Sequence, residues 1–250
     1  MPCSMDEIRK GFHNDLSDVS SELAHLAAHV TESIPRATNI LLSGDLEGAD
    51  RMISGDGEID LRAADLEERC LQILALQSPV AGDLRRLVAA LRIISEVERS
   101  ADLVCNICKA ARRIYGHQLD PSLRGIITRM GEQAQQLYIA AIESFVENDA
   151  SKAAAIDDMD NYLDALQKQF VQAIFESHSN GTIDLQVAVQ LAVVARFYER
   201  IGDHAVNIGE RVRFVVTGWL PEHRGAARYR LRQLDESAEL TRPLATDSGG

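Results

Sequence analysis

The sequence predicts an all-α protein made of two tandem, pseudo-symmetric three-helix bundles. Few turn-forming residues, long stretches of helical apolar spacing and an internal repeat support this prediction. The 250 residues include 16 Gly and 6 Pro, fewer than the average usage of about 12% for these two residue types. Only 5% of the residues are aromatic. Because sandwiches and barrels need many turns between short strands, this composition disfavours an all-β fold.

The second half of the chain repeats the pattern of the first. Residues 83–112 match residues 184–213, and residues 37–60 match residues 141–164, with a three-residue deletion between the two blocks. The period is longer than the roughly 20–50 residues of solenoid repeats, so each copy is expected to be a small bundle. The coinciding pairs include Asp45/Asp149, Asp56/Asp160, Asp60/Asp164, Glu98/Glu199, Asp102/Asp203, Asn106/Asn207 and Arg112/Arg213.

Each copy is expected to supply three helices. The first helices cover residues 6 to about 43 and 122 to about 148, and Pro35 is expected to kink the former or to start a segment within it. The second helices contain the apolar stripes of residues 59–73 and 163–174. The third helices show the 3-4-3-4 spacing of an amphipathic helix in a bundle. Their apolar positions are Ala90, Ile93, Val97, Ser100, Val104, Ile107, Ala111 and Ile114, with one polar member, and Leu191, Val194, Tyr198, Ile201, Ala205, Ile208, Val212 and Val215.

Glycine, proline and small polar residues mark the expected helix ends. We expect breaks at Ser43-Gly44-Asp45, Ser54-Gly55-Asp56-Gly57, Ser78-Pro79, Asp120-Pro121, Ser179-Asn180-Gly181 and Gly218. The predicted domains are residues 1–117, the N-terminal three-helix bundle, and residues 118–219, the C-terminal one. Beyond Pro221 the apolar period fades, so residues 220–250 are expected to form a charged, disordered tail.

The chain is acidic and carries no targeting pattern. It has 26 Lys and Arg against 38 Asp and Glu, a formal net charge of -12, which disfavours a surface that binds nucleic acid. Asp6 and Glu7 stand where a signal peptide needs a basic start, and no apolar stretch approaches a membrane span. The four cysteines are too few for a disulfide framework. We therefore expect a cytoplasmic protein that does not insert into a membrane.

Eight acidic residues recur as four pairs with i, i+4 spacing, two pairs in each copy. On a helix, residues four apart project from the same face. Each pair lies beside the apolar stripe of its helix. At that position a neighbouring helix comes close but does not cover the carboxylates. The pairs are Asp56 with Asp60 and Glu98 with Asp102 in the first copy, and Asp160 with Asp164 and Glu199 with Asp203 in the second.

Converging carboxylates repel one another, so each group needs either a cation or dispersal into solvent. Two interpretations stay open on the residues alone: a pair of metal sites, and a solvated acidic face, which is the usual meaning of a single E-x-x-x-D on a helix. An oxygen-only donor set suits Mg²⁺, Mn²⁺ or iron better than structural zinc. The predicted cofactor is a divalent or trivalent metal ion, with Mg, Mn, Fe and Zn as candidates.

Other motifs are interpreted as structural. Cys105 and Cys108 form a single C-x-x-C inside a predicted helix, which favours two small, partly buried thiols over a zinc or redox site. Glu22, His25 and His29 are interpreted as a solvated helix face, since a di-iron bundle would need the E-x-x-H motif twice. The sequence contains no P-loop, nucleophile elbow or dinucleotide-binding motif. Nothing indicates a nucleophile beside a base, so the protein is predicted not to be an enzyme.

Two stretches resemble the PhoU family, the regulators of phosphate-specific uptake. Residues 195–208, ARFYERIGDHAVNI, resemble its signature, and residues 77–85, QSPVAGDLR, resemble its first-half turn. The resemblance covers residues 5 to about 217. It implies two tandem three-helix bundles, each with a pair of E/D-x-x-x-D motifs that can hold a metal ion or small metal cluster, at the eight acidic positions named above. The first half departs from the pattern at Ser100 and Ala101, where Ile-Gly is usual.

The resemblance implies a regulatory adaptor. PhoU proteins damp the phosphate-starvation response by contacting a phosphate-sensing histidine kinase and the ATPase of the phosphate ABC transporter, and they self-associate. We therefore expect a negative regulator of phosphate uptake that forms a homodimer and has those two partners. The alternative is a metal-dependent oxidase or hydrolase that uses the carboxylate clusters.

Overall fold

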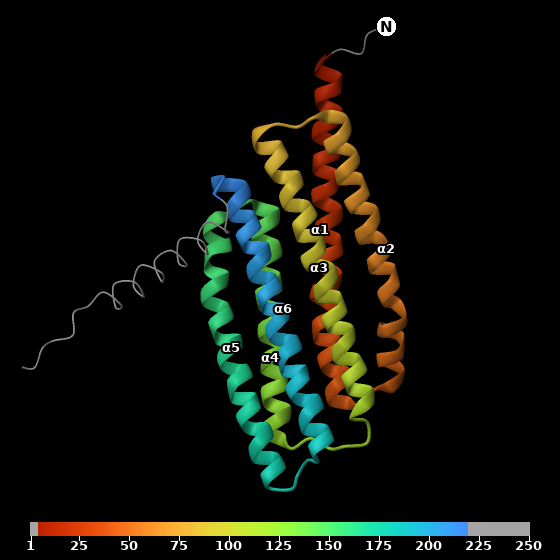
Figure 1. Ribbon diagram of the computed structural model, residues 1–250, viewed down its shortest axis with the longest axis vertical. Helices are drawn as coiled ribbons and strands as arrows, with labels where there is room; N and C mark the ends of the chain where they lie inside the picture. The colour runs from red at the N-terminus through yellow and green to blue at the C-terminus, as the bar shows by residue number, and fades with distance from the viewer. Residues whose placement is uncertain (1–4, 220–250) are drawn as a thin grey trace, which may run out of the picture.

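The computed structural model describes residues 5–219, which form six α-helices and contain no strand (Figure 1). This confirms the predicted all-α class. The expected tail, residues 220–250, lies outside the described residues. The helices are α1 (Met5–Ser43), α2 (Leu46–Gln77), α3 (Ala81–Arg113), α4 (Pro121–Glu147), α5 (Ala150–Ser179) and α6 (Leu185–Thr217).

The six helices run along the long axis of the molecule as two bundles side by side (Figure 1). Helices α1, α2 and α3 pack against one another, and α4, α5 and α6 do the same. The bundles meet where α3 packs on α6 and α1 packs on α4, and one apolar core runs through both. The predicted pair of three-helix bundles is confirmed, while the domain boundary at residue 117 stays a prediction.

Aspartates at equivalent places in the two copies begin the second helices. Asp45 accepts a hydrogen bond from the backbone N–H of Gly48 at 2.8 Å. Asp149 accepts from the N–H groups of Ser151 and Lys152 at 2.8 and 3.1 Å. These amides lie in the first turn and have no partner within the helix. The repeat therefore preserves the helix caps as well as the apolar faces.

One predicted break is wrong, while the other five lie at helix ends. The Ser54–Gly57 segment lies inside α2, which continues from Leu46 to Gln77. Each glycine in a helix interior costs about 1 kcal/mol relative to alanine. On either side of the segment, however, Ile59 is buried in the core and Met52 packs against it. This packing outweighs the local preference for a turn.

Pro35 lies within α1 without ending it. A proline lacks the N–H that would bond to the carbonyl four residues earlier, which here belongs to Thr31. The side-chain amide of Gln135, on α4, donates to that carbonyl at 3.4 Å. A neighbouring helix therefore supplies the missing donor, and α1 is not divided into two segments.

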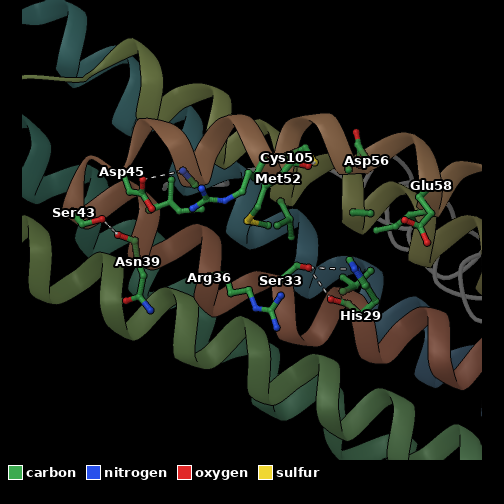
Figure 2. Close-up of a pocket in the computed structure, with 18 residues that line it drawn as sticks. His29, Ser33, Arg36, Asn39, Ser43, Asp45, Met52, Asp56, Glu58 and Cys105 are labelled. Carbon is green, nitrogen blue, oxygen red and sulfur yellow. Dashed lines mark hydrogen bonds between the residues drawn. The ribbon is translucent and has the colours of Figure 1, made fainter.

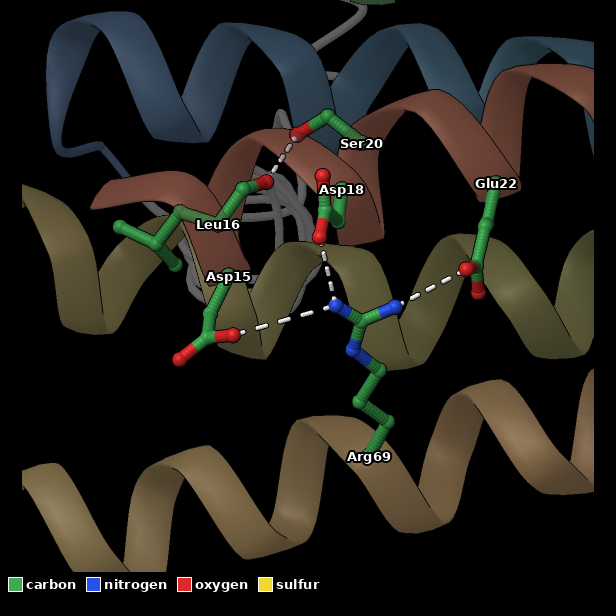
Figure 3. Close-up of polar contacts among 6 residues, drawn as sticks. All are labelled: Asp15, Leu16, Asp18, Ser20, Glu22 and Arg69. Carbon is green, nitrogen blue, oxygen red and sulfur yellow. Dashed lines mark hydrogen bonds and ion pairs between the residues drawn. The ribbon is translucent and has the colours of Figure 1, made fainter. Parts of the chain in front are cut away.

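A single arginine on α2 holds the N-terminal part of α1. The Arg69 guanidinium lies 3.8, 2.9 and 2.9 Å from the carboxylates of Asp15, Asp18 and Glu22 (Figure 3). The three acidic residues share one face of α1, at spacings of three and four. Glu22 therefore belongs to an ion-pair network, and the nearby His25 is exposed, as expected of a solvated helix face.

The apolar stripes of the third helices form the centre of the core. Every position of the predicted stripe in α3 is buried, and in α6 only Val215 is half-buried. The hydroxyl groups of Tyr198 on α6 and Thr38 on α1 share a hydrogen bond of 2.8 Å between the two bundles. Across residues 5–219, no helix has both the length and the apolar character needed to cross a bilayer.

Candidate functional site

In the C-terminal bundle, the four predicted carboxylates belong to two helices that pack together. Asp160 and Asp164 come from α5, and Glu199 and Asp203 come from α6. Gly202 allows a close approach, because a methyl group there would lie 2.5 Å from Asp160 Oδ1. The Asp160 carboxylate therefore rests against the backbone of α6, next to the residue that carries the last of the four carboxylates.

Burial and mutual repulsion act together on these carboxylates. Burial raises the pKa of Asp160 to about 6, helped by the other three carboxylates of the cluster and by Asp157. Burial and the charge of Asp203 raise the pKa of Glu199. Burial and the charge of Asp164 also raise the pKa of Asp203, against the opposing charge of Arg196. The pKa values of Asp160, Glu199 and Asp203 are therefore raised by neighbouring carboxylates, as happens when like charges converge.

Two buried oxygen atoms in this cluster lack a hydrogen-bond partner among the described residues: Asp160 Oδ1 and Glu199 Oε2. The other Glu199 oxygen accepts a hydrogen bond from Arg196 in an ion pair. A buried carboxylate oxygen without a donor is unfavourable. A cation near either atom would satisfy it, and oxygen donors suit Mg²⁺, Mn²⁺ or iron.

The N-terminal bundle repeats this arrangement between α2 and α3. Burial and the charge of Asp60 raise the pKa of Glu98, and burial and the charge of Asp56 raise the pKa of Asp102. Asp56 Oδ1 is buried and, within residues 5–219, has no hydrogen-bond partner. Glu67 adds a further negative charge near Glu98. The sequence did not indicate Glu67 because it has no acidic counterpart in the second copy.

The carboxylates of each cluster interact without forming a finished coordination shell. In the part of the chain that the structure describes, no three His, Cys, Asp or Glu side chains are grouped closely enough to hold a metal ion. Asp60, Asp102 and Asp203 are exposed, and the other five predicted ligands are partly buried. Side chains would have to rotate to complete either site. Metal binding at the eight residues therefore stays a prediction.

A cavity of about 580 Å³ opens in the N-terminal bundle, between α1, α2 and α3 (Figure 2). Asp56 is the one predicted ligand that lines it in the described structure. His29 lines it from α1, Met52 from α2 and Cys105 from α3. The sequence did not indicate this cavity, because its size depends on how far apart three helices stand.

A polar contact near the C-terminal cluster links the two bundles. His204 Nδ1 on α6 shares a hydrogen bond with the Glu96 carboxylate on α3, and Asn207 donates to the same oxygen at 3.2 Å. Burial raises the pKa of Glu96, but these hydrogen bonds outweigh it, so the pKa is lowered. The repeat could not indicate this pair, since Glu96 and His204 align with Phe197 and Leu103.

Comparison with known proteins identifies the family. The model of the PhoU domain matches the chain twice, over residues 23–111 and 127–212. PhoU homolog 1 of Mycobacterium leprae is 34% identical over 216 residues, which cover 86% of this chain and 96% of the relative. PhoU homolog 2 of Mycobacterium tuberculosis is 34% identical over 215 residues, which cover 86% of this chain and 100% of the relative. Both relatives are named phosphate-specific transport system accessory proteins.

Solved structures agree with the sequence comparison. The crystal structure of the phosphate transport system regulatory protein PhoU from Streptococcus pneumoniae has a TM-score of 0.78 and 26% identity, covering 84% of this chain and 98% of that chain. The PhoU structure from Pseudomonas aeruginosa has the same TM-score and identity, covering 83% and 100%. Because the family model matches both bundles and the relatives match almost end to end, the chain belongs to the PhoU family.

Proposed function

We propose that this protein is a non-enzymatic regulator of phosphate transport, a metal-binding adaptor that restrains phosphate uptake and the phosphate-starvation response. One observation carries the proposal: accessory proteins of phosphate-specific transport match this chain over nearly their whole length. The match includes both bundles, and the matched ranges, residues 23–111 and 127–212, contain all eight carboxylate positions.

The proposed partners are the ATPase of a phosphate ABC transporter and a sensor histidine kinase, met in the cytoplasm. A net charge of -12 favours association with basic partner surfaces. Self-association as a homodimer is proposed as well. An exposed apolar stripe on α6, formed by Leu185, Val189 and Val193 at i, i+4 spacing, supports contact with another protein.

The proposed metal sites are the two carboxylate clusters. Asp160, Asp164, Glu199 and Asp203 would hold an ion in one cluster, and Asp56, Asp60, Glu98 and Asp102 would hold one in the other. A bound Mg, Mn, Fe or Zn ion supplies positive charge that cancels the repulsion between the carboxylates. Since each cluster spans two helices, a metal there would tie α5 to α6 and α2 to α3, fixing the surface that a partner contacts.

The experiment is a complementation assay in the organism that encodes the protein. Deletion of the gene is expected to activate a phosphate-starvation reporter in phosphate-rich medium, and the wild-type gene is expected to restore repression. The double variant Glu199→Gln with Asp203→Asn is expected to restore it poorly. A control with the same charge change, Glu132→Gln with Asp158→Asn, replaces two exposed carboxylates and should restore it fully. An unchanged reporter after deletion would contradict the proposed function.

Turnover separates the adaptor from the metal-dependent oxidase or hydrolase. The raised pKa of Asp160, about 6, is the observation that favours an enzyme, because a general acid or base works best with a pKa near the ambient pH. Purified protein with Mn²⁺ or Fe²⁺ is expected to show no sustained phosphatase or peroxidase turnover. Activity that disappears in Glu199→Ala would favour the enzyme.

A further inference from the structure

Two cysteines of α3 contact Met52 of α2 in the N-terminal bundle. Cys105 and Cys108 stand three residues apart on α3, so their side chains share one face of the helix. Cys108 Sγ lies 3.8 Å from Met52 Sδ on α2, and Cys105 Sγ lies 3.7 Å from the backbone carbonyl of Met52. Both cysteines are free and buried. Asp56 of the N-terminal carboxylate cluster lies beside this group: burial and the Asp56 carboxylate together raise the pKa of both thiols.

The repeat shows that the sulfur atoms are particular to this half. Met52, Cys105 and Cys108 align with Ile156, Val206 and Gly209 in the C-terminal half, none of which has a metal-binding side chain. There, a methyl group on Gly209 would lie 2.8 Å from Ile156 Cδ1, so the two helices touch at the same place. One helix contact is therefore made by glycine and isoleucine in one copy and by sulfur against sulfur in the other.

We propose that Met52, Cys105 and Cys108 form a binding site for a soft monovalent metal ion, Cu(I). Thiolates and thioethers are the ligands that Cu(I) prefers. With metal–sulfur bonds of about 2.3 Å, two sulfur atoms 3.8 Å apart subtend an angle of about 110° at the ion. The distance between Met52 Sδ and Cys108 Sγ therefore suits two ligands of one ion. Cys105, whose Sγ lies 3.7 Å from the Met52 carbonyl, would supply the third by turning its thiol from that carbonyl to the ion.

The ligand set distinguishes this ion from zinc. Structural zinc takes four Cys, His or carboxylate ligands, and the described residues contain no group of even three such side chains close enough to hold an ion. Methionine adds the thioether that a soft, low-coordinate ion accepts. The 580 Å³ cavity is lined by Met52 and Cys105, so two of the three ligands border a space through which an ion can enter (Figure 2).

Binding replaces two thiol protons with one cation. Both thiols release their protons to water, and the two thiolates with one Cu(I) leave the site with a single negative charge. No electron is transferred, since the ion enters already reduced. The soft sulfur site and the hard oxygen clusters select different ions, and Asp56, which borders Cys105, belongs to the oxygen cluster.

Competition with bicinchoninate, a coloured Cu(I) chelator, tests the site under anaerobic conditions. The full-length parent carries Cys3→Ala, which removes the thiol outside the described residues. It is expected to withdraw one equivalent of Cu(I) from the chelator. Cys105→Ala, Cys108→Ala and Met52→Leu should each weaken binding by at least the roughly 10–100-fold that an outer-shell change costs. Met52→Leu conserves volume, so it keeps the test valid if a thiol variant folds poorly.

Two controls decide whether the sulfur group is specific. Cys70→Ala deletes an equally buried thiol elsewhere on α2 and should leave Cu(I) binding unchanged. Glu199→Gln with Asp203→Asn should leave it unchanged too. A parent protein that leaves all Cu(I) with the chelator would overturn the site, and so would a Cys70→Ala variant that weakens binding as much as Cys108→Ala.

Discussion

Gly202 decides how closely Asp160 approaches α6. With no side chain on Gly202, the carboxylate occupies the volume that a methyl group would fill, and Leu163 also lies within 2.8 Å of that position. The equivalent residue in the N-terminal bundle is Ala101, whose methyl group takes this space. The two clusters therefore share their acidic residues but differ in how tightly the helices behind them can pack.

Gly202→Ala is expected to destabilise the protein. The added methyl group must displace Asp160 and Leu163, and overpacking of this kind costs about 1–3 kcal/mol. Gly125→Ala is the matched control, because a methyl group there would meet no other atom within 4 Å and alanine is the better helix former. Chemical denaturation measures both. Equal stability for the two variants would show that Asp160 does not need the space at Gly202.

Asp160→Asn is expected to raise stability at neutral pH and to lose that advantage in acid. The pKa of Asp160 is about 6 in the folded protein and about 3.9 in an unfolded chain. Between these values the folded state binds more protons, so lowering the pH stabilises the wild-type protein. The variant lacks this titration. Denaturation at pH 7, 5.5 and 4 measures the gap in unfolding free energy, and a gap that widens toward acid would contradict the assignment.

Among the elements, α1 depends on a donor from another helix. Gln135 donates to the Thr31 carbonyl that Pro35 leaves without its usual partner. Gln135→Leu is expected to cost about 1 kcal/mol of unfolding free energy, the typical loss for an unmade hydrogen bond. In a Pro35→Ala background the backbone N–H of residue 35 can donate to the Thr31 carbonyl, so Gln135→Leu should cost less unfolding free energy there. Additive effects in this double-mutant cycle would count against the compensation.

The contact between α1 and α2 depends on Arg69. Arg69→Met keeps most of the apolar stem and removes the cation that binds three carboxylates, two of them at 2.9 Å. The expected loss is about 1 kcal/mol at low ionic strength, at the upper end for exposed ion pairs, and less at high salt. Arg36→Met, which breaks one exposed i, i+4 pair with Glu32, should lose less. A loss independent of salt would point to packing instead.

The helices themselves could be predicted where periodicity and caps agree. The stripe ending at Ile114 and the breaks at Gly44 and Gly218 all follow from local residue chemistry. The segment around Gly55 could not be predicted, because its turn-forming residues stay helical only through packing of their neighbours on the core. The local sequence sets the helix propensity of a segment, but tertiary contacts can override that propensity.

On the scale of the whole molecule, the two bundles share one core. The repeat indicated the composition of each bundle, including the acidic pairs, because both copies carry the same residues. It could not indicate how the bundles join, since the joining residues differ between the copies. Glu96 with His204 and Thr38 with Tyr198 connect positions more than a hundred residues apart. Such contacts depend on packing between bundles, which an internal repeat does not encode.

Melting in the presence of metal ions tests the paired carboxylates most directly. Added Mn²⁺, Mg²⁺, Fe²⁺ or Zn²⁺ is expected to raise the Tm of the metal-free protein. At a hundred times its Kd, an ion stabilises the folded state by about 2.7 kcal/mol per site, and each kcal/mol raises the Tm by about 2–4 °C in a protein of this size. Glu199→Gln with Asp203→Asn should remove the contribution of the second cluster, and adding Glu98→Gln with Asp102→Asn should remove the rest.

The exposed-carboxylate control, Glu132→Gln with Asp158→Asn, should keep the full rise in Tm. Two results together would contradict metal binding: a wild-type Tm that none of the four ions changes, and no metal in the protein by elemental analysis. The clusters would then be a solvated acidic face.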